Sequence, residues 1–393
     1  MRKFAIPITV LIAGFGISYR LYTGLQTNES EIAAVEFKRL AANIPLALTN
    51  SIKGYSTAIE ALKNMTSVSL KHSDELNLDQ PEDYRKLKEE WDGTKVFFNQ
   101  MAKDAEVSFP GLFALGWVLP TSYSELKQLE LVGKFLISPK FKIRQFQGDG
   151  LVEEIVELDE HFPIWYVEPM QQNEIGLGMD LASAGVTRDA VIEARDTGNI
   201  VSTEPINWVG DLAGQPGFLV FDAVYLNDEP MATTEERRAN LHSVSYGAIL
   251  VDDMMKYSLR GLREEGLKFF VFSHAQEIES GSPLAAPVYS SDGRPESFEE
   301  CRAAAAVSGF EQISVFDVLG RYWSLYSYPQ PEFISRYQSK TPAVAFTTGI
   351  LITLTLAMYL FQSASRTQRI QAQVDERTRE LFSSNENFER EMA

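Results

Sequence analysis

The sequence predicts an α+β protein in which two small mixed units follow a long helix and lie between two membrane spans. Three observations support this fold class. Uncharged apolar runs occupy residues 4–19 and 341–365, near the two ends of the chain. Apolar residues recur at three- and four-residue steps through residues 29–71, as on one face of a helix. Short β-rich runs follow without regular crossover helices between them, which favours two α+β units over a doubly wound sheet.

Composition limits the class of protein further. The chain has 393 residues, and its apolar share of 45% is enough for two or three domains, each with a buried core. With 54 acidic against 36 basic residues the net charge is -18, which argues against a general nucleic-acid binder. Cys301 is the single cysteine, so no intramolecular disulfide is possible.

The first apolar run, Phe4–Tyr19, follows the basic pair Arg2 and Lys3. This pattern is typical of a signal peptide or of a signal anchor. No small-x-small cleavage site follows the run, and residues 21–25 extend it toward the roughly 20 residues that a bilayer requires. We therefore predict an uncleaved membrane anchor, with the cytoplasmic tip and first transmembrane helix in residues 1–25.

The second run, residues 341–365, is bounded by Lys340 and Arg366. A buried core helix of this length would carry polar residues, so the run is predicted to be a second span. Arg2 and Lys3 precede the first span, and Arg366 and Arg369 follow the second. Basic residues next to a span stay on the cytoplasmic side. We therefore expect a two-span protein of the bacterial inner membrane, with both ends cytoplasmic and residues 26–340 outside.

Residues 26–78 are predicted to form a stalk helix that continues out of the first span. Only Pro45 and Gly54 interrupt its helical pattern. A helix packed inside the globular part is the alternative, but continuity with the span favours a stalk. One or two further helices are expected after the start signal at Asp79, over residues 79–105.

Two units are predicted beyond the stalk, at residues 79–245 and 246–340. Each contains short β-rich runs. In the first unit these lie at residues 109–120, 141–146, 164–167 and 218–225, and a helix at residues 188–197 ends at Gly198. In the second unit they lie at residues 246–251, 267–273 and 312–328, and the last of these suggests antiparallel strands.

Apolar residues recur at strict seven-residue steps after the second span, at Val374, Leu381 and Phe388. This spacing predicts a parallel coiled coil in residues 366–393, and therefore a homodimer. A solvated helix next to the membrane is the alternative. The chain ends without a helix stop signal, so we expect the natural protein to continue beyond this truncated helix.

Several short motifs occur in order between the two spans. They are Phe-Pro-Gly-Leu at 109–112, Ala-Leu-Gly-Trp-Val at 114–118, Trp-Tyr-Val-Glu-Pro at 165–169, Gly-Met-Asp-Leu at 178–181, Ala-Arg-Asp-Thr-Gly at 194–198 and Pro-Gly-Phe at 216–218. This series resembles the CHASE family of extracytoplasmic sensor domains, over roughly residues 79–260.

The resemblance implies a stalk helix that carries two tandem PAS-like lobes, one of which holds a small ligand. It also implies a dimeric receptor whose cytoplasmic output is a histidine kinase, acting on a response regulator, or alternatively a diguanylate cyclase or phosphodiesterase. Residues 376–381 look like the linker that precedes such outputs. Because neither output lies within residues 1–393, we expect no enzyme in this part of the protein, and no cofactor.

Plant members of the family bind adenine-type cytokinins through an aspartate, and the equivalent position here is Thr187, seven residues after Asp180. A hydroxyl cannot replace the carboxylate that pairs with an adenine edge. The threonine that these receptors place near the base corresponds to about Phe221. The sequence therefore predicts a ligand other than an adenine-type cytokinin.

Seven residues are predicted to line the ligand pocket: Trp117, Met179, Thr187, Val209, Phe218, Phe221 and Tyr246. Their apolar and aromatic character favours a small, flat or partly apolar molecule. Because none of them is charged, a dicarboxylate would lack a partner. Arg188 would supply that partner if its side chain pointed into the pocket, but its position at the start of a helix favours a side chain that is exposed to water.

No catalytic or metal-binding motif is evident. The four histidines, His72, His161, His242 and His274, show no spacing typical of a metal site. Glu168 and Asp180 could form an acid/base pair, although a binding role or a turn explains them better. The sequence contains no nucleophile elbow and no phosphate loop. A membrane-anchored hydrolase or an envelope-tethering structural protein are the rival functions.

Overall fold

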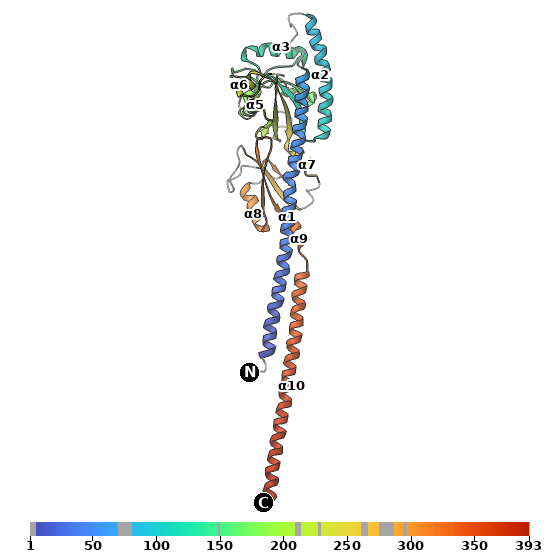
Figure 1. Cartoon of the computed structure of the whole chain (residues 1–393), viewed down its shortest axis with the longest axis vertical. Helices are drawn as coiled ribbons and strands as arrows, with labels where there is room; N and C mark the ends of the chain where they lie inside the picture. The colour runs from blue at the N-terminus through green and yellow to red at the C-terminus, as the bar shows by residue number, and fades with distance from the viewer. Residues whose placement is uncertain are drawn as a thin grey trace. The chain divides into compact units, whose positions relative to one another are not determined.

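The computed structural model describes residues 5–69, 81–147, 150–208, 214–226, 229–260, 266–274, 287–293 and 297–392. The chain forms two compact units, Met1–Glu36 with Pro331–Ala393, and Phe37–Gln330. Helix α1, Ala5–Ser69, contributes to both units and is drawn in blue in Figure 1. The predicted long N-terminal helix is therefore confirmed.

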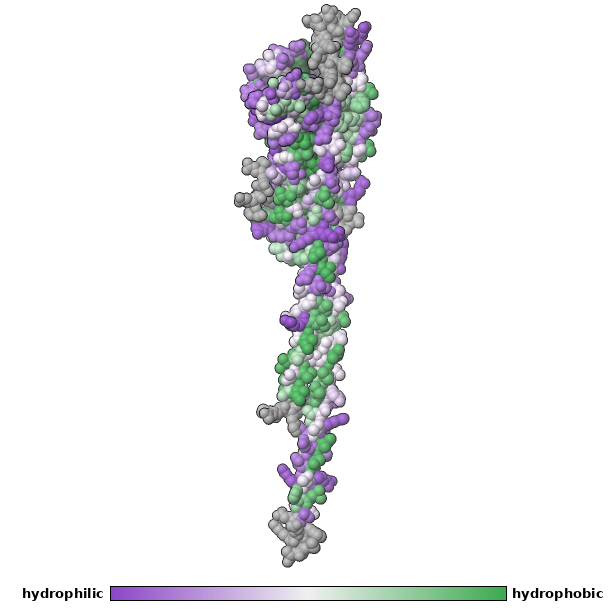
Figure 2. Space-filling view, viewed as in Figure 1, coloured by the Kyte–Doolittle hydropathy of each residue, from purple (hydrophilic) through white to green (hydrophobic). Residues whose placement is uncertain are grey.

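The first unit is helical. It contains the start of α1, the short helix α9 (Pro331–Tyr337) and the long helix α10 (Thr341–Met392). Among the described residues, α1 and α10 are the two helices long and apolar enough to cross a membrane. Figure 2 shows hydrophobic side chains gathered along both helices of this unit. The two predicted spans fall within these helices.

Small residues allow the two apolar helices to approach closely. A Cβ atom on Gly14 would lie 2.3 Å from the Thr353 side chain, and one on Gly349 would lie 2.4 Å from Ser18 Oγ. The rings of Tyr22 and Phe346 pack nearby, with centroids 5.4 Å apart. Close contact at small residues is the usual basis of helix association in a membrane, where the lipid removes the hydrophobic driving force.

We expect Gly14→Leu to separate α1 from α10, because the new side chain would overlap Thr353. Overpacking of this kind costs about 1–3 kcal/mol. Disulfide cross-linking of Tyr22→Cys with Phe346→Cys in membranes, in a Cys301→Ser background, measures the approach. Gly16→Leu is the matched control, since no atom lies within 4 Å of a Cβ at Gly16. Equal cross-linking in both leucine variants would contradict this packing.

The part of α1 that belongs to the second unit buries a regular row of apolar side chains. These are Phe37, Leu40, Ala41, Ile44, Leu48, Ile52, Tyr55, Ile59 and Leu62. Their three- and four-residue spacing gives one continuous buried face. Pro45 lies inside the helix, where a proline normally costs about 3 kcal/mol, and burial of this face offsets that cost.

An antiparallel sheet of six strands forms the first lobe. Its path is β4-β1-β8-β7-β5, and β6 pairs with β7. The strands are β1 (Leu112–Val118), β4 (Ile164–Glu168), β5 (Val201–Ser202), β6 (Ile206–Asn207), β7 (Pro216–Tyr225) and β8 (Leu241–Leu250). A separate hairpin pairs β2 (Gln145–Gln147) with β3 (Gly150–Val152).

Helices cover both faces of this sheet. They are α2 (Pro81–Ser108), η3 (Tyr123–Glu125), α3 (Leu126–Leu136), α4 (Met170–Asn173), η4 (Glu174–Gly176), η5 (Leu181–Ser183), α5 (Gly185–Thr197), α6 (Thr234–Ala239) and α7 (Val251–Ser258). Helices α1 and α2 pack on one face, where Ile59 lies against Gly247 and Phe98 stacks on Trp117. Helix α5 packs on β7 and ends, as predicted, at Gly198, whose φ of 73° suits a glycine cap.

The predicted boundary between residues 245 and 246 is wrong. It would divide β8, which pairs along its length with β7 and, over residues 244–249, with β1. All of β8 therefore belongs to the first lobe. A local β-pattern shows that a strand exists but not which strands it pairs with, because its partners lie far away in the chain.

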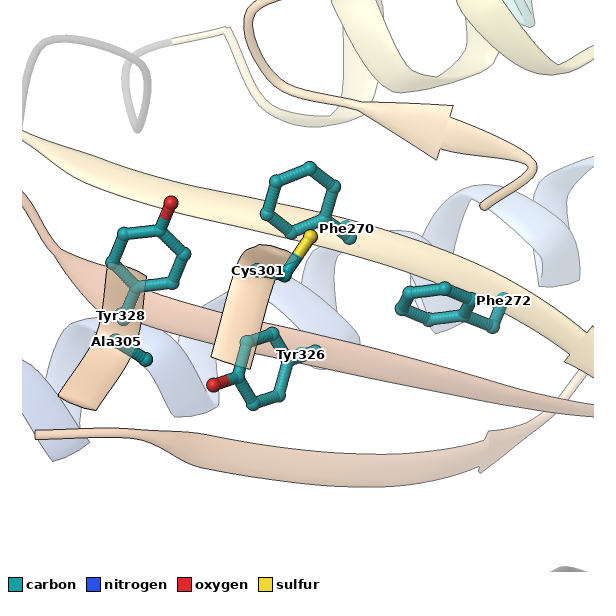
Figure 3. Packing of buried hydrophobic residues seen from close by; sticks show 6 residues of the cluster. All are labelled: Phe270, Phe272, Cys301, Ala305, Tyr326 and Tyr328. Atoms are coloured by element: carbon teal, nitrogen blue, oxygen red, sulfur yellow. The ribbon is translucent and has the colours of Figure 1, made fainter. Parts of the chain in front are cut away.

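The second lobe is a four-stranded antiparallel sheet in the order β10-β9-β12-β11. Its strands are β9 (Leu267–His274), β10 (Tyr289–Ser290), β11 (Gln312–Asp317) and β12 (Tyr322–Pro329), and helix α8 (Phe298–Ser308) covers it. Figure 3 shows the core between α8 and the sheet, where Cys301 and Ala305 face Phe270, Phe272, Tyr326 and Tyr328. The predicted antiparallel pairing within residues 312–328 is confirmed.

The two lobes contact each other through the turn between β11 and β12. Ser202 of β5 donates its backbone N–H to Leu319 O at 2.8 Å and its hydroxyl to Val318 O at 2.5 Å. Leu319 has a φ of 53°, a left-handed conformation that is uncommon outside glycine. Arg321 forms an ion pair with Glu193 of α5 at 2.9 Å. The turn is therefore held by the first lobe.

Residues 366–392 continue α10 as a helix. Of the predicted coil positions, Val374 and Leu381 are exposed in the single chain, as a seam without its partner would be. Phe388 lies in the same helix, but its side chain is outside the described residues. Pairing of two chains through these positions stays a prediction.

Candidate functional site

A cavity of about 540 Å³ lies against the first sheet, on the face opposite α1 and α2. Its floor is formed by side chains of β1, β7 and β8, and its roof by the segment from α4 to the start of α5. The floor includes Ala114, Leu219, Tyr246 and Ala248, and the roof includes Gln171, Ile175, Gly176, Met179, Leu181 and Thr187. Trp208, which follows β6, closes one edge.

Two glycines make room for the aromatic rings of this cavity. A Cβ on Gly116 would lie 2.4 Å from Cε1 of Tyr246, its partner in the β1–β8 register. A Cβ on Gly217 would lie 2.1 Å from Nε1 of Trp208. Both rings can therefore lie directly on the strands, which leaves the space above them open.

The roof is fixed by side-chain hydrogen bonds to its backbone. The Thr187 hydroxyl donates to Leu181 O at 2.5 Å and lies 3.0 Å from Ala184 O. The guanidinium of Arg144 donates to the carbonyls of Ile175 and Leu177, at 2.6 and 3.0 Å. Because the proton of Thr187 is used in this way, its hydroxyl can only accept a hydrogen bond from a ligand.

Asp180 holds the backbone of the same segment through buried hydrogen bonds. It is fully buried and accepts hydrogen bonds from the backbone N–H groups of Phe162 and Ala182, at 2.8 and 3.1 Å. His161 Nδ1 lies 2.7 Å from its carboxylate. Leu158 donates its N–H to His161 Nε2, so the ring proton is assigned to Nδ1 and points at Asp180. These contacts make Asp180 a structural residue.

Two polar groups within the cavity have no protein partner among the described residues. The indole Nε1 of Trp208 is buried without a hydrogen bond. Among the described residues the Tyr246 hydroxyl has none either, and burial raises the pKa of this phenol, which therefore stays a neutral donor. Buried polar groups are normally paired, so the Tyr246 hydroxyl is available to a ligand, whereas Nε1 of Trp208 packs against Gly217.

Charge in the cavity is sparse. Glu174 is the one ionisable carboxylate among the described lining residues, and no lysine or arginine joins it. The side chain of Arg188 is 49% exposed and lies 3.5 Å from Asp189, outside the cavity. An anionic ligand would therefore lack a cationic partner here.

The structure brings three of the seven predicted pocket residues together. Met179, Thr187 and Tyr246 all line this cavity. Phe221 is fully buried beside it, and its ring centroid lies 6.4 Å from that of Tyr246. Val209 lies outside the described residues.

The other two predicted residues point away from this cavity. Trp117 follows Gly116 on β1 and therefore faces α2, where it stacks on Phe98. Phe218 precedes Leu219 on β7 and packs against Trp323 of the second lobe. Neither residue lines this cavity, because neighbouring residues of a strand alternate between its two faces.

Sequence reasoning missed Trp208 and Ile175, which both line the cavity. Ile175 belongs to η4, a single-turn helix that directly follows the single-turn helix α4, and both are too short to show a periodic pattern. Trp208 is a lone aromatic after a two-residue strand, and its position depends on contact with Gly217 rather than on local sequence.

The carboxylates considered for acid/base chemistry are both engaged elsewhere. Glu168 accepts hydrogen bonds from the Tyr166 hydroxyl at 2.5 Å and from Asn99 Nδ2 at 2.9 Å. Neither Glu168 nor Asp180 lines the cavity. Within the described part of the chain, no group of three metal-ligating side chains could hold an ion.

The part of the chain that carries this cavity matches a known domain family. The CHASE domain family matches residues 94–280. A hybrid signal transduction histidine kinase of Dictyostelium discoideum is 21% identical over 239 residues, which cover 57% of this chain and 11% of that protein. The chain thus spans about a tenth of the length of that relative.

Two bacterial sensory domains are similar in structure at low identity. The periplasmic sensory domain of a Campylobacter jejuni chemoreceptor is 12% identical, with a TM-score of 0.41 over 80% of this chain and 100% of that one. The ligand-binding domain of a Pseudomonas aeruginosa amino-acid chemoreceptor, in complex with GABA, is 11% identical, with a TM-score of 0.34 over 76% and 98%. The family match is the finding that bears on classification: residues 94–280 match the CHASE domain family, which the sequence motifs predicted.

Proposed function

We propose that residues 1–393 form the extracytoplasmic ligand-sensing and transmembrane part of a homodimeric receptor whose cytoplasmic output is a histidine kinase. The observation that carries the proposal is the cavity of about 540 Å³ within the part of the chain that matches the CHASE domain family, where the Tyr246 hydroxyl is an unused hydrogen-bond donor. The histidine kinase named above supports the choice of output. Each sheet would form the core of a PAS-like lobe.

The route from ligand to membrane would run through α1. Strand β7 contributes Leu219 to the cavity floor, and Asp222 of the same strand accepts a hydrogen bond from Lys63 of α1 at 2.7 Å. The same helix contains the first candidate span. A ligand that moves β7 would therefore bias the position of α1, and both chain ends would lie in the cytoplasm of a bacterial cell.

Exposed apolar side chains support the homodimer. Leu46 on α1 and Val96 and Phe97 on α2 are 60%, 73% and 61% exposed. A partner that covers such side chains removes their apolar surface from water. A second copy of the chain would cover them, and the helices after the second span would then pair in parallel through Val374 and Leu381.

The ligand that fits the cavity best is a small, flat and partly apolar molecule. Tyr246 would donate a hydrogen bond to it, and Thr187 would accept one. A dianion is disfavoured because no cationic side chain lines the described cavity. An adenine-type ligand is disfavoured because Thr187 cannot supply a carboxylate.

Tyr246→Phe tests the site. The whole chain in nanodiscs is screened against metabolites by thermal unfolding, since a bound ligand stabilises the folded state by mass action. Loss of one neutral hydrogen bond costs about 1 kcal/mol, so the variant should bind a stabilising ligand about fivefold more weakly. Tyr289→Phe, in β10 of the second lobe, is the matched control.

Two outcomes would reject this site. One is unchanged affinity in Tyr246→Phe and in the cavity-filling variant Ala248→Phe. The other is stabilisation by organic dianions that disappears in Arg188→Ala. The second outcome would show that the half-exposed arginine binds the ligand instead.

A further inference from the structure

A second cavity, of about 500 Å³, lies on the other face of the first sheet. Helices α2 and α3 form its outer wall, and β1, β4 and β8 contribute to its floor. None of the described residues that line it lines the first cavity. It is therefore a separate space in the same lobe, and the function proposed above leaves it unused.

Three of the five tryptophans of the chain line this second cavity. Trp91 comes from α2, Trp117 from β1 and Trp165 from β4. The ring centroid of Trp91 lies 5.9 Å from that of Trp117 and 6.0 Å from that of Trp165. Indole faces attract organic cations more strongly than the rings of tyrosine or phenylalanine do.

Core packing alone would explain tryptophans that fill the space around them. Trp117 does stack on Phe98, with ring centroids 5.0 Å apart. The volume beside the three indoles is nevertheless open, and the Nε1 atoms of Trp91 and Trp117 are buried without a hydrogen-bond partner among the described residues. An open cavity lined by aromatic rings and a few polar groups is typical of a binding site rather than of a finished core.

The charge around this cavity is acidic. Glu90 of α2 and Glu125 of η3 line it, together with the imidazole of His242 and with no lysine or arginine among the described lining residues. A hydrogen bond from the Ser122 side chain lowers the pKa of Glu125, which therefore stays ionised at neutral pH. The carboxylates have the sign that complements a cation held against the indoles.

We propose that this second cavity binds a small organic cation with an apolar or aromatic body, such as a quaternary ammonium compound. The indoles of Trp91, Trp117 and Trp165 would contact the body and the charged head. Glu90 and Glu125 would supply the counter-charge at the rim. Binding here would fix α2 against β1 and β4, on the face of the sheet opposite the first ligand site.

Isothermal titration of the whole chain in nanodiscs tests the proposal, with benzyltrimethylammonium as the probe. Benzyl alcohol and benzenesulfonate are the neutral and anionic comparison compounds. The cation should bind in a saturable manner, the alcohol at least about fivefold more weakly, and the sulfonate not measurably. Equal binding of the cation and the alcohol would overturn the proposal, as would the absence of binding to the folded protein.

Variants locate the binding. Glu90→Gln should weaken binding of the cation about fivefold, whereas Glu89→Gln, an exposed neighbour on α2 outside the lining, should leave it unchanged. Val132→Trp should abolish binding by filling the cavity. Tyr246→Phe, in the first cavity, should have no effect on this probe. Full binding of the cation to a folded Val132→Trp variant would overturn the assignment to this cavity. Equal losses of affinity in Glu90→Gln and Glu89→Gln would overturn it as well. If Val132→Trp does not fold, the comparison of the two glutamine variants decides the assignment.

Discussion

Replacing Trp323 with alanine is expected to lower the free energy of unfolding by about 4 kcal/mol, the largest effect of any change considered for this chain. The indole is fully buried in β12. Its edge meets Phe218 of the first lobe at a centroid distance of 5.5 Å and Phe316 of β11 at 6.4 Å. The substitution removes buried apolar area and leaves a cavity between the two lobes.

Urea unfolding of the whole chain in detergent measures this effect. Tyr322→Ala, the preceding residue on the same strand, is the control, because its side chain is only half-buried and faces the other side of the sheet. We expect the control to cost about 1 kcal/mol. The alanine variant at position 323 should also unfold in two separate steps, because the contact that joins the lobes is lost. A single transition with a midpoint close to that of the wild type would contradict the role of Trp323.

The second large effect is expected for Lys63→Met, at about 2 kcal/mol of lost stability. Lys63 Nζ lies 2.7 Å from Asp222 Oδ1, and the two side chains are 31% and 5% exposed. Removing the lysine leaves a buried carboxylate without its charged partner. The expected loss in free energy of unfolding is smaller than the usual cost of breaking a buried ion pair, because water reaches Lys63. Lys53→Met, on the exposed side of α1, should change stability by less than about 0.5 kcal/mol.

The stability lost in Lys63→Met is expected to depend on pH. Burial raises the pKa of Asp222 above its ordinary value of 3.8, while Lys63 opposes the shift. A carboxyl with a raised pKa favours the folded state at low pH, and this contribution is lost as the pH rises through the folded-state pKa. The penalty of Lys63→Met should therefore be small near pH 4 and full at neutral pH.

A double variant separates the charge from the packing. Lys63→Met with Asp222→Asn removes both charges and should recover most of the stability at neutral pH, because no buried charge remains uncompensated. Circular dichroism during thermal unfolding, at several pH values, measures all the variants. A penalty that is independent of pH, or that persists in the double variant, would show that the methylene chain of Lys63 matters rather than its charge.

Much of the fold could be predicted from local patterns. Alternating and β-branched residues marked β4 and β7, and the run that ends at Gly198 marked α5, because these elements depend on neighbours in the sequence. The uncharged runs near both ends marked the candidate spans for the same reason. The lobe boundary was missed because β8 is assigned to a lobe only by its pairing with β1 and β7.

The residues of the candidate site could likewise be predicted only in part. Local patterns placed Met179, Thr187 and Tyr246 beside short strands and a helix start, and the structure brings all three to one cavity. Trp117 faces the other side of the sheet, and no local pattern could show this. Because side chains alternate along a strand, the register between β1 and β8, which pairs Gly116 with Tyr246, selects which face each residue reaches.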